Sequence, residues 1–128
     1  MDLEKPEKVI ILTVIGVFVL SSVSSLSAFG NPITRQEAIE ISKNSDLVKE
    51  GLAIAHSFSV DATYYNSSMV EQLKLGHNRE IFENVPEGHG AWEVVWGINR
   101  GGGGYLIIVI VDAETGTVIH ETKGVEFV

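Results

Sequence analysis

The stretch Tyr105-Leu-Ile-Ile-Val-Ile-Val111 is apolar at every position, and Asp112-Ala-Glu-Thr-Gly116 follows it directly. An apolar run rich in β-branched residues, without polar alternation, is typical of a strand that is covered on both faces. Asp112 can accept a hydrogen bond from the backbone two residues further on, and Gly116 can adopt a positive φ. These residues predict a central strand that ends in a tight turn.

The flanking sequence predicts the neighbouring strands. Ser57 to Tyr65 and Ala91 to Ile98 alternate, so each places apolar or aromatic side chains on one face of a half-buried strand. Four consecutive glycines, Gly101 to Gly104, predict a flexible hairpin connection. Thr117 to Glu121 predicts the next strand, and residues 125–128 add a short edge segment.

Helix signals precede these strands. Thr34 and Glu37 have the spacing of a capping box and predict a helix through Ser42. Asn44-Ser45-Asp46 interrupts this helix and caps a second one, from Leu47 to about Leu52.

A third helix signal follows the first predicted strand. Ser68 and Glu71 form a second candidate capping box, and Gly76 closes that short helix. His77 to Gly90 has no clear period and predicts a surface loop. The predicted fold is α+β, in which N-terminal helices pack on an antiparallel sheet in the order helix, strand, helix and three-strand meander.

A hydrophobic helix is predicted before this domain. Val9 to Phe29 holds 21 residues, of which 14 are apolar and none is charged. As a helix it would be about 31 Å long, which matches a hydrocarbon core of about 30 Å. The serines after Leu20 leave a cleaved secretory signal as the alternative. The chain therefore divides into an anchor or signal, residues 1–30, and one domain, residues 31–128.

The expected location of the protein follows from this hydrophobic segment, Val9 to Phe29. An apolar segment this close to the N-terminus normally routes the following domain across a membrane. We expect a single-pass protein of the cell membrane with an extracytoplasmic domain, or a secreted domain if the leader is cleaved.

Composition excludes several classes of function. The chain carries 9 Lys+Arg and 17 Asp+Glu, a net charge of −8, whereas a nucleic-acid binder needs clustered cations. It contains no Cys, which excludes disulfides, thiolate metal ligands and thiol nucleophiles. No nucleophile–base pair or phosphate-binding loop stands out, so we expect neither an enzyme nor a bound cofactor.

The same elements carry a family resemblance. They are an opening Ile33-Thr34-x-x-Glu37-Ala38-Ile39, a strand around Trp92-Glu93-Val94, and the ending Val109-x-Val111-Asp112-Ala113-x-Thr115-Gly116-x-Val118. This pattern, over roughly residues 33–121, resembles the PepSY domain, although residues 57–90 are longer than that pattern requires. The resemblance implies an extracytoplasmic binding or inhibitory module of the kind found in metallopeptidase propeptides. It transfers no catalytic residue, and Asp112 and Gly116 match as turn formers.

Two groups of apolar side chains are candidates for a partner surface. Tyr64, Trp92 and Trp96 fall on one face, where they pack in the core or form an aromatic groove for a peptide. Leu106, Ile108 and Ile110 lie on the second face of the central strand. If nothing covers that face, it is a surface for a protein partner or for self-association into a homo-oligomer.

Two polar features of the sequence are also candidate sites. His77 and His89 share one predicted loop with three glutamates and form a weak candidate metal site, with a solvated loop as the alternative. Asn66-Ser67-Ser68 is a glycosylation sequon in a predicted turn.

Three hypotheses for function follow. The first is a non-enzymatic extracytoplasmic module that binds a protein or peptide and restrains a peptidase. The second is a small-ligand or metal sensor that uses the loop with His77 and His89. The third is an accessory subunit of a membrane complex, bound through Val9 to Phe29.

Overall fold

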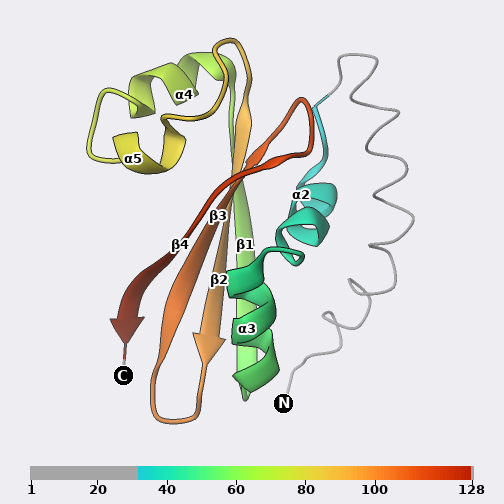
Figure 1. The fold of residues 1–128 in the computed structure, drawn as a ribbon, viewed down its shortest axis with the longest axis vertical. Coiled ribbons are helices and arrows are strands. Elements are labelled where there is room, and N and C mark those ends of the chain that lie inside the picture. The colour runs from blue at the N-terminus through green and yellow to red at the C-terminus, as the bar shows by residue number, and fades with distance from the viewer. Residues whose placement is uncertain (1–31, 128) are drawn as a thin grey trace.

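The structure, a computed structural model, describes residues 32–127. Within that range the chain forms a four-stranded antiparallel sheet with helices packed against it, which confirms the predicted α+β class (Figure 1). The predicted hydrophobic helix and the anchor or signal, residues 1–30, lie outside the described residues.

Helices α2 (Arg35–Ser42) and α3 (Asp46–Ile54) open the domain. The predicted capping box is present before α2: the Glu37 amide donates to Thr34 Oγ1 at 3.1 Å, and the Thr34 amide donates to Glu37 Oε1 at 2.7 Å. Within the predicted capping stretch Asn44–Asp46, the Ser45 side chain caps α3, so the helix begins one residue before Leu47 and ends two residues past Leu52. Gly51 lets α3 approach the sheet, because a Cβ there would lie 3.0 Å from Ile107 Cδ1.

The sheet is a meander in the order β1-β2-β3-β4, built from β1 (Ser57–Tyr65), β2 (Ala91–Asn99), β3 (Gly104–Asp112) and β4 (Val118–Phe127). The bounds of β1 are those predicted from its alternation. Strand β4 runs six residues past the predicted end at Glu121, with register irregularities opposite Tyr105–Ile107 and Ile110–Val111.

One face of the sheet, here called the helix face, packs under α2 and α3. The register places Val60 beside Trp96 and Ala62 beside Val94, so the predicted apolar faces of β1 and β2 coincide. The side chains buried here form the larger core: Ile33, Ala38, Ile39, Ile41, Val48, Val94, Trp96, Ile98, Tyr105, Ile107, Val109 and Val111.

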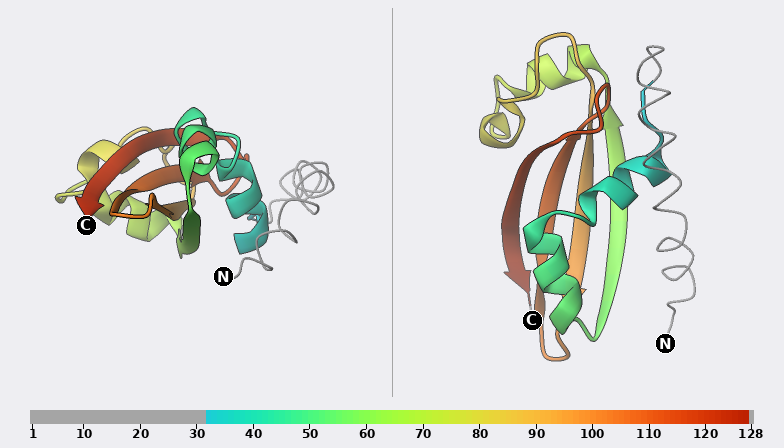
Figure 2. Two further views of the ribbon diagram at one scale, coloured as in Figure 1. Left: turned by 90° about the horizontal axis from the view of Figure 1, so that it is seen from below. Right: turned by 45° about the vertical axis from the view of Figure 1, so that its right-hand side comes forward.

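The other face, here called the second face, is covered at one end by α4 (Ser67–Leu73) and α5 (Arg79–Phe82). Figures 1 and 2 show this pair at the end of the sheet opposite the β2–β3 hairpin, away from α3. A smaller core of Val70, Phe82, Val85, Ala91 and Ile110 lies beneath the pair.

This region corrects two sequence predictions. Residues 77–90 are not simply a surface loop, because they contain α5 and bury Phe82 and Val85. The cap of α4 is Asn66 and not Ser68: Asn66 Oδ1 accepts from the Met69 amide at 2.9 Å. The competing cap lay two residues upstream, where an Asn is at least as favourable as a Ser.

Candidate functional site

The predicted Asp112–Gly116 turn is present and tightly bonded. Asp112 Oδ1 accepts from the amides of Glu114 at 2.7 Å and Thr115 at 3.2 Å, and Gly116 has a φ of 74°. The Gly116 amide also donates to the Asp112 carbonyl at 2.8 Å. Both residues therefore act as turn formers, as predicted.

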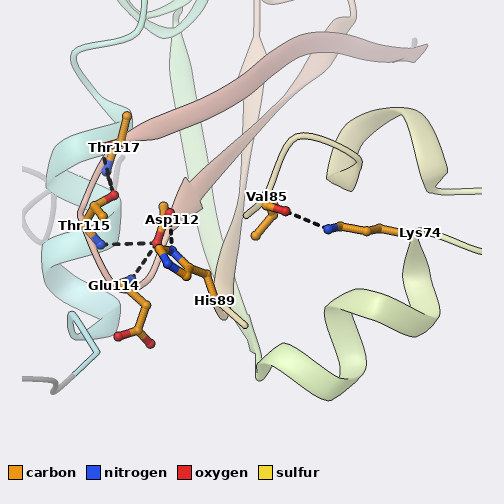
Figure 3. A network of polar contacts seen from close by, with 7 residues as sticks. All are labelled: Lys74, Val85, His89, Asp112, Glu114, Thr115 and Thr117. Atoms are coloured by element: carbon orange, nitrogen blue, oxygen red, sulfur yellow. Dashed lines mark hydrogen bonds and ion pairs between the residues drawn. The ribbon is translucent and has the colours of Figure 1, made fainter. Parts of the chain in front are cut away.

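Asp112 has a second role that the sequence did not indicate. Its Oδ2 lies 2.8 Å from His89 Nδ1, and Figure 3 shows the imidazole reaching the carboxylate from the segment before β2. The carboxylate is buried, while the His89 side chain is 30% exposed. The Ala113 amide also donates to the Gly90 carbonyl at 3.0 Å, so the loop and the turn are joined twice.

A hydrogen bond from Lys74 holds α4 to the same loop. Lys74 Nζ donates to the Val85 carbonyl at 2.6 Å (Figure 3). It also donates to Glu71 Oε2 at 3.1 Å. A charged donor gives such bonds about twice the strength of neutral ones. Together with the buried Phe82 and Val85, this bond fixes residues 66–89, here called the α4–α5 block, on the sheet.

His77 and His89 do not form a cluster with other ligands. His77 is exposed, whereas His89 contacts Asp112. Among residues 32–127, no three His, Asp or Glu side chains lie close enough together to hold a metal ion.

The aromatic candidates separate into a buried and an accessible part. Trp96 has no exposed surface, and its Nε1 donates to Ser42 Oγ at 2.9 Å. Trp92 Nε1 donates to the Ile33 carbonyl at 2.9 Å, and its ring centroid lies 5.3 Å from that of Tyr64, which is 38% exposed. Trp96 is therefore a core residue and not part of a partner surface, because α2 covers it.

Ile110 was also a candidate for the partner surface, and the structure places it in the core. It has no exposed surface, since the α4–α5 block covers it. Ile108 is half-buried against the edge of that block, and Leu106 is half-buried beyond it. Only part of the predicted apolar surface on β3 is accessible.

The accessible remainder, here called the open face, is the half of the second face nearest the β2–β3 hairpin. It consists of Ser57, Ser59, Asp61, Val95, Gly97, Leu106, Ile108, Thr122, Gly124 and Phe127. A groove of about 250 Å³ crosses it, lined by Ser57, Phe58, Ser59, Gly97, Asn99, Leu106 and Phe127. The groove lining contains no charged residue, and Asp61 lies outside the groove at the β1 edge of the open face.

Phe127 joins this groove to a second one at the hairpin. The second cavity, of about 330 Å³, is lined by Arg100, Gly102, Gly103, Gly104, Tyr105, Glu126 and Phe127. Phe127 is 42% exposed. The sequence prediction missed it, because a single Phe in a short terminal segment gives no period.

Charged groups lie around the open face. At the β1 edge, Arg35 donates to Asp61 Oδ1 at 2.9 Å, and this hydrogen bond holds the pKa of Asp61 below its usual value. Under the α4–α5 block, the Tyr65 hydroxyl donates to Glu93 Oε1 at 3.2 Å. Burial, followed by the Glu93 charge, raises the pKa of Tyr65.

Asn66, the glycosylation candidate, is exposed and uses Oδ1 for the α4 cap. A glycan would attach to the amide nitrogen, so the cap leaves the sequon chemistry available. Glycosylation stays a prediction.

Comparison of the chain with protein-family models, with curated proteins and with solved structures finds no match. None of the helices within residues 32–127 has the length and apolar composition needed to cross a membrane. The predicted span, residues 9–29, lies outside this range.

Proposed function

We propose that the domain is a non-enzymatic, extracytoplasmic protein-binding module of PepSY type, held at the membrane by residues 9–29, and that the open face is its binding surface. Following the PepSY resemblance, the proposed role includes restraint of a peptidase. The observation that carries the proposal is the uncharged groove beside Leu106 and Phe127 in an acidic domain. Depletion of charge and an exposed aromatic ring are features of interface cores.

The test is capture from membranes with the full chain as bait. Leu106→Glu places a charge in the groove, and Ala53→Glu places one at an exposed position of α3 on the opposite side of the sheet. We expect a partner that is retained by the native chain and by Ala53→Glu and lost with Leu106→Glu. Retention by all three chains would contradict the assignment of the surface, and circular dichroism checks that the variants fold.

One contact favours a second candidate, a metal or small-ligand sensor at His89. A carboxylate on Nδ1 leaves Nε2 as the ring nitrogen available to a ligand, an arrangement common in metal sites. The test is thermal unfolding with and without Zn²⁺. A stabilisation that persists in His77→Ala and disappears in His89→Ala would support this candidate. No shift in the native chain would exclude it.

A further inference from the structure

The chain enters the described domain at Ile33, which is held from both sides. Its amide donates to the Ala113 carbonyl at 2.9 Å, and its carbonyl accepts from Trp92 Nε1 at 2.9 Å. The Ile33 side chain is 1% exposed. The entry point is therefore fixed beside the β3–β4 turn, at the end of the sheet opposite the β2–β3 hairpin (Figure 1). This end is here called the turn end.

The turn end is wide, because structure projects there from both faces of the sheet. Ile33 packs on the helix face, and the α4–α5 block stands on the second face (Figure 2). The groove lies at the other end, since Phe127 pairs with Gly104 beside the hairpin. The entry point and the groove are thus separated by the length of the sheet.

Exposed apolar side chains by themselves do not select one end of the sheet. Three large ones lie at the turn end and three at the hairpin end: Tyr64, Met69 and Leu75 at the first, Ile54, Val125 and Phe127 at the second. A second observation is needed to decide which end lies near a membrane.

The short connection before the domain supplies it. In the proposed function residues 9–29 span the membrane, which leaves Gly30 and Asn31 between Phe29 and Pro32. The three steps from Phe29 to Pro32 reach about 11 Å at full extension. The headgroup layer on one side of the hydrocarbon is about 6 Å thick, so Pro32 lies no more than about 5 Å beyond it.

We propose that this connection holds the turn end against the lipid headgroups, as a membrane-contact surface, and holds the groove away from the bilayer. The nine residues of β3 span about 27 Å between the two ends. A lean toward the second face would bring the α4–α5 block to the headgroups first and keep the open face clear of lipid.

The chemistry of the turn end fits zwitterionic headgroups better than anionic ones. Tyr64 is 38% exposed beside Trp92, and both residue types favour the membrane interface. The α4–α5 block holds more acidic than basic residues, so anionic headgroups would repel it. Its charged residues are Glu71, Glu80, Glu83 and Glu87 against Lys74 and Arg79.

The orientation rests on the proposed function and adds a property of the partner. A groove about 27 Å from the headgroups is out of reach of a segment embedded in the bilayer. The partner would therefore bind through a part of its chain that lies in the aqueous phase.

The first experiment measures depth with a label on a single cysteine, because the native chain has none. The full chain with Thr115→Cys, Ser68→Cys or Gly102→Cys is labelled with a thiol-reactive fluorophore in phosphatidylcholine vesicles. A fraction of the lipid carries a nitroxide on its headgroup, which quenches nearby fluorophores. Thr115 and Ser68 are exposed at the turn end, and Gly102 is exposed in the hairpin with no atom within 4 Å of an added Cβ.

We expect loss of fluorescence at both turn-end labels and little loss at Gly102→Cys. Equal quenching at all three positions would overturn the proposal. Quenching at Thr115→Cys alone would also overturn it, since the α4–α5 block would then stand clear of the lipid.

The second experiment lengthens the connection. About twelve Gly and Ser residues inserted between Gly30 and Asn31 have a root-mean-square length of about 19 Å. We expect quenching at Ser68→Cys to fall to the level at Gly102→Cys, while the same residues added after Val128 change nothing. Quenching that survives the insertion would overturn the role of the connection, because lipid binding alone would then hold the domain.

Flotation of the vesicles separates failure of the orientation from failure of the proposed function. A chain that floats with the vesicles and is quenched equally at all positions overturns the orientation and keeps the anchor. Capture with Leu106→Glu then still tests the groove. A chain that does not float overturns the anchor, and the orientation with it.

Discussion

The two faces of the sheet bury their apolar side chains by different means. On the helix face, two capped helices cover strands whose apolar residues alternate regularly, and Trp96 is fully enclosed. On the second face, two short helices cover one end and leave Leu106 half-exposed. An apolar strand such as β3 shows that both faces need cover. It does not show how far the cover extends.

The largest expected effect is on the helix face. Trp96→Ala removes the largest fully buried side chain and leaves Ser42 Oγ without its indole donor. We expect a loss of about 4 kcal/mol in the free energy of unfolding, measured by urea denaturation. A loss below about 1 kcal/mol would show that this core repacks.

Phe82→Ala tests whether the smaller core is as well packed. Phe82 is 1% exposed, and its ring centroid lies 5.6 Å from that of Tyr65. We expect a loss of about 3 kcal/mol, with amide exchange accelerated more in α4, which covers the second face, than in α2, which covers the helix face. Equal acceleration in both helices would mean that the two faces unfold as one unit.

Asp112→Ala removes the carboxylate that holds the turn to His89. Two amides and the imidazole lose their acceptor, and we expect a loss of about 2 kcal/mol by the same denaturation measurement. His89→Ala removes one of these contacts and should cost about half as much. Equal losses would place the stabilisation in the His89 contact alone.

Leu106→Glu should have a small effect on stability, under about 1 kcal/mol, because the side chain borders the open groove. Thermal unfolding beside Ala53→Glu measures this. A loss as large as that of Phe82→Ala would make the open face part of the core.

The smallest effect concerns Glu40 on α2. Burial raises the pKa of this carboxyl above 4.5, and Lys43 and Gln36 offset the rise in part. The folded chain then binds a proton more readily than the unfolded chain, so this group lowers stability as the pH rises from 4.5 through the raised pKa. We expect Glu40→Gln to be more stable than the native chain at pH 7. Denaturation at low pH, where both side chains are neutral, should show no difference.

Most of the fold could be predicted from local signals. Alternation determined the bounds of β1, the capping box determined the start of α2, and Asp112 with Gly116 determined the turn. These features depend on residues a few positions apart. Phe82 and Val85 have no such pattern, and their burial depends on a sheet face formed by distant residues.

The candidate site was less predictable for the same reason. His89 and Asp112 are 23 residues apart, and the register of β2 against β3 brings them together. Leu106 was identified as a candidate from β3 alone. Whether it or Ile110 was accessible depended on how far the α4–α5 block reaches.

The hydrogen bond from the Ile33 amide to the Ala113 carbonyl, 2.9 Å long, has a mechanical consequence. It places the start of the domain at the β3–β4 turn, and Phe127 lies at the opposite end of the sheet (Figure 1). Tension applied between these two points runs along β4. Ladder bonds in an antiparallel pair are perpendicular to the strands, so such a load shears many of them together instead of opening them one at a time. Such a load reaches β4 only through the Ile33–Ala113 hydrogen bond, so this single bond limits the force that the ladder can share.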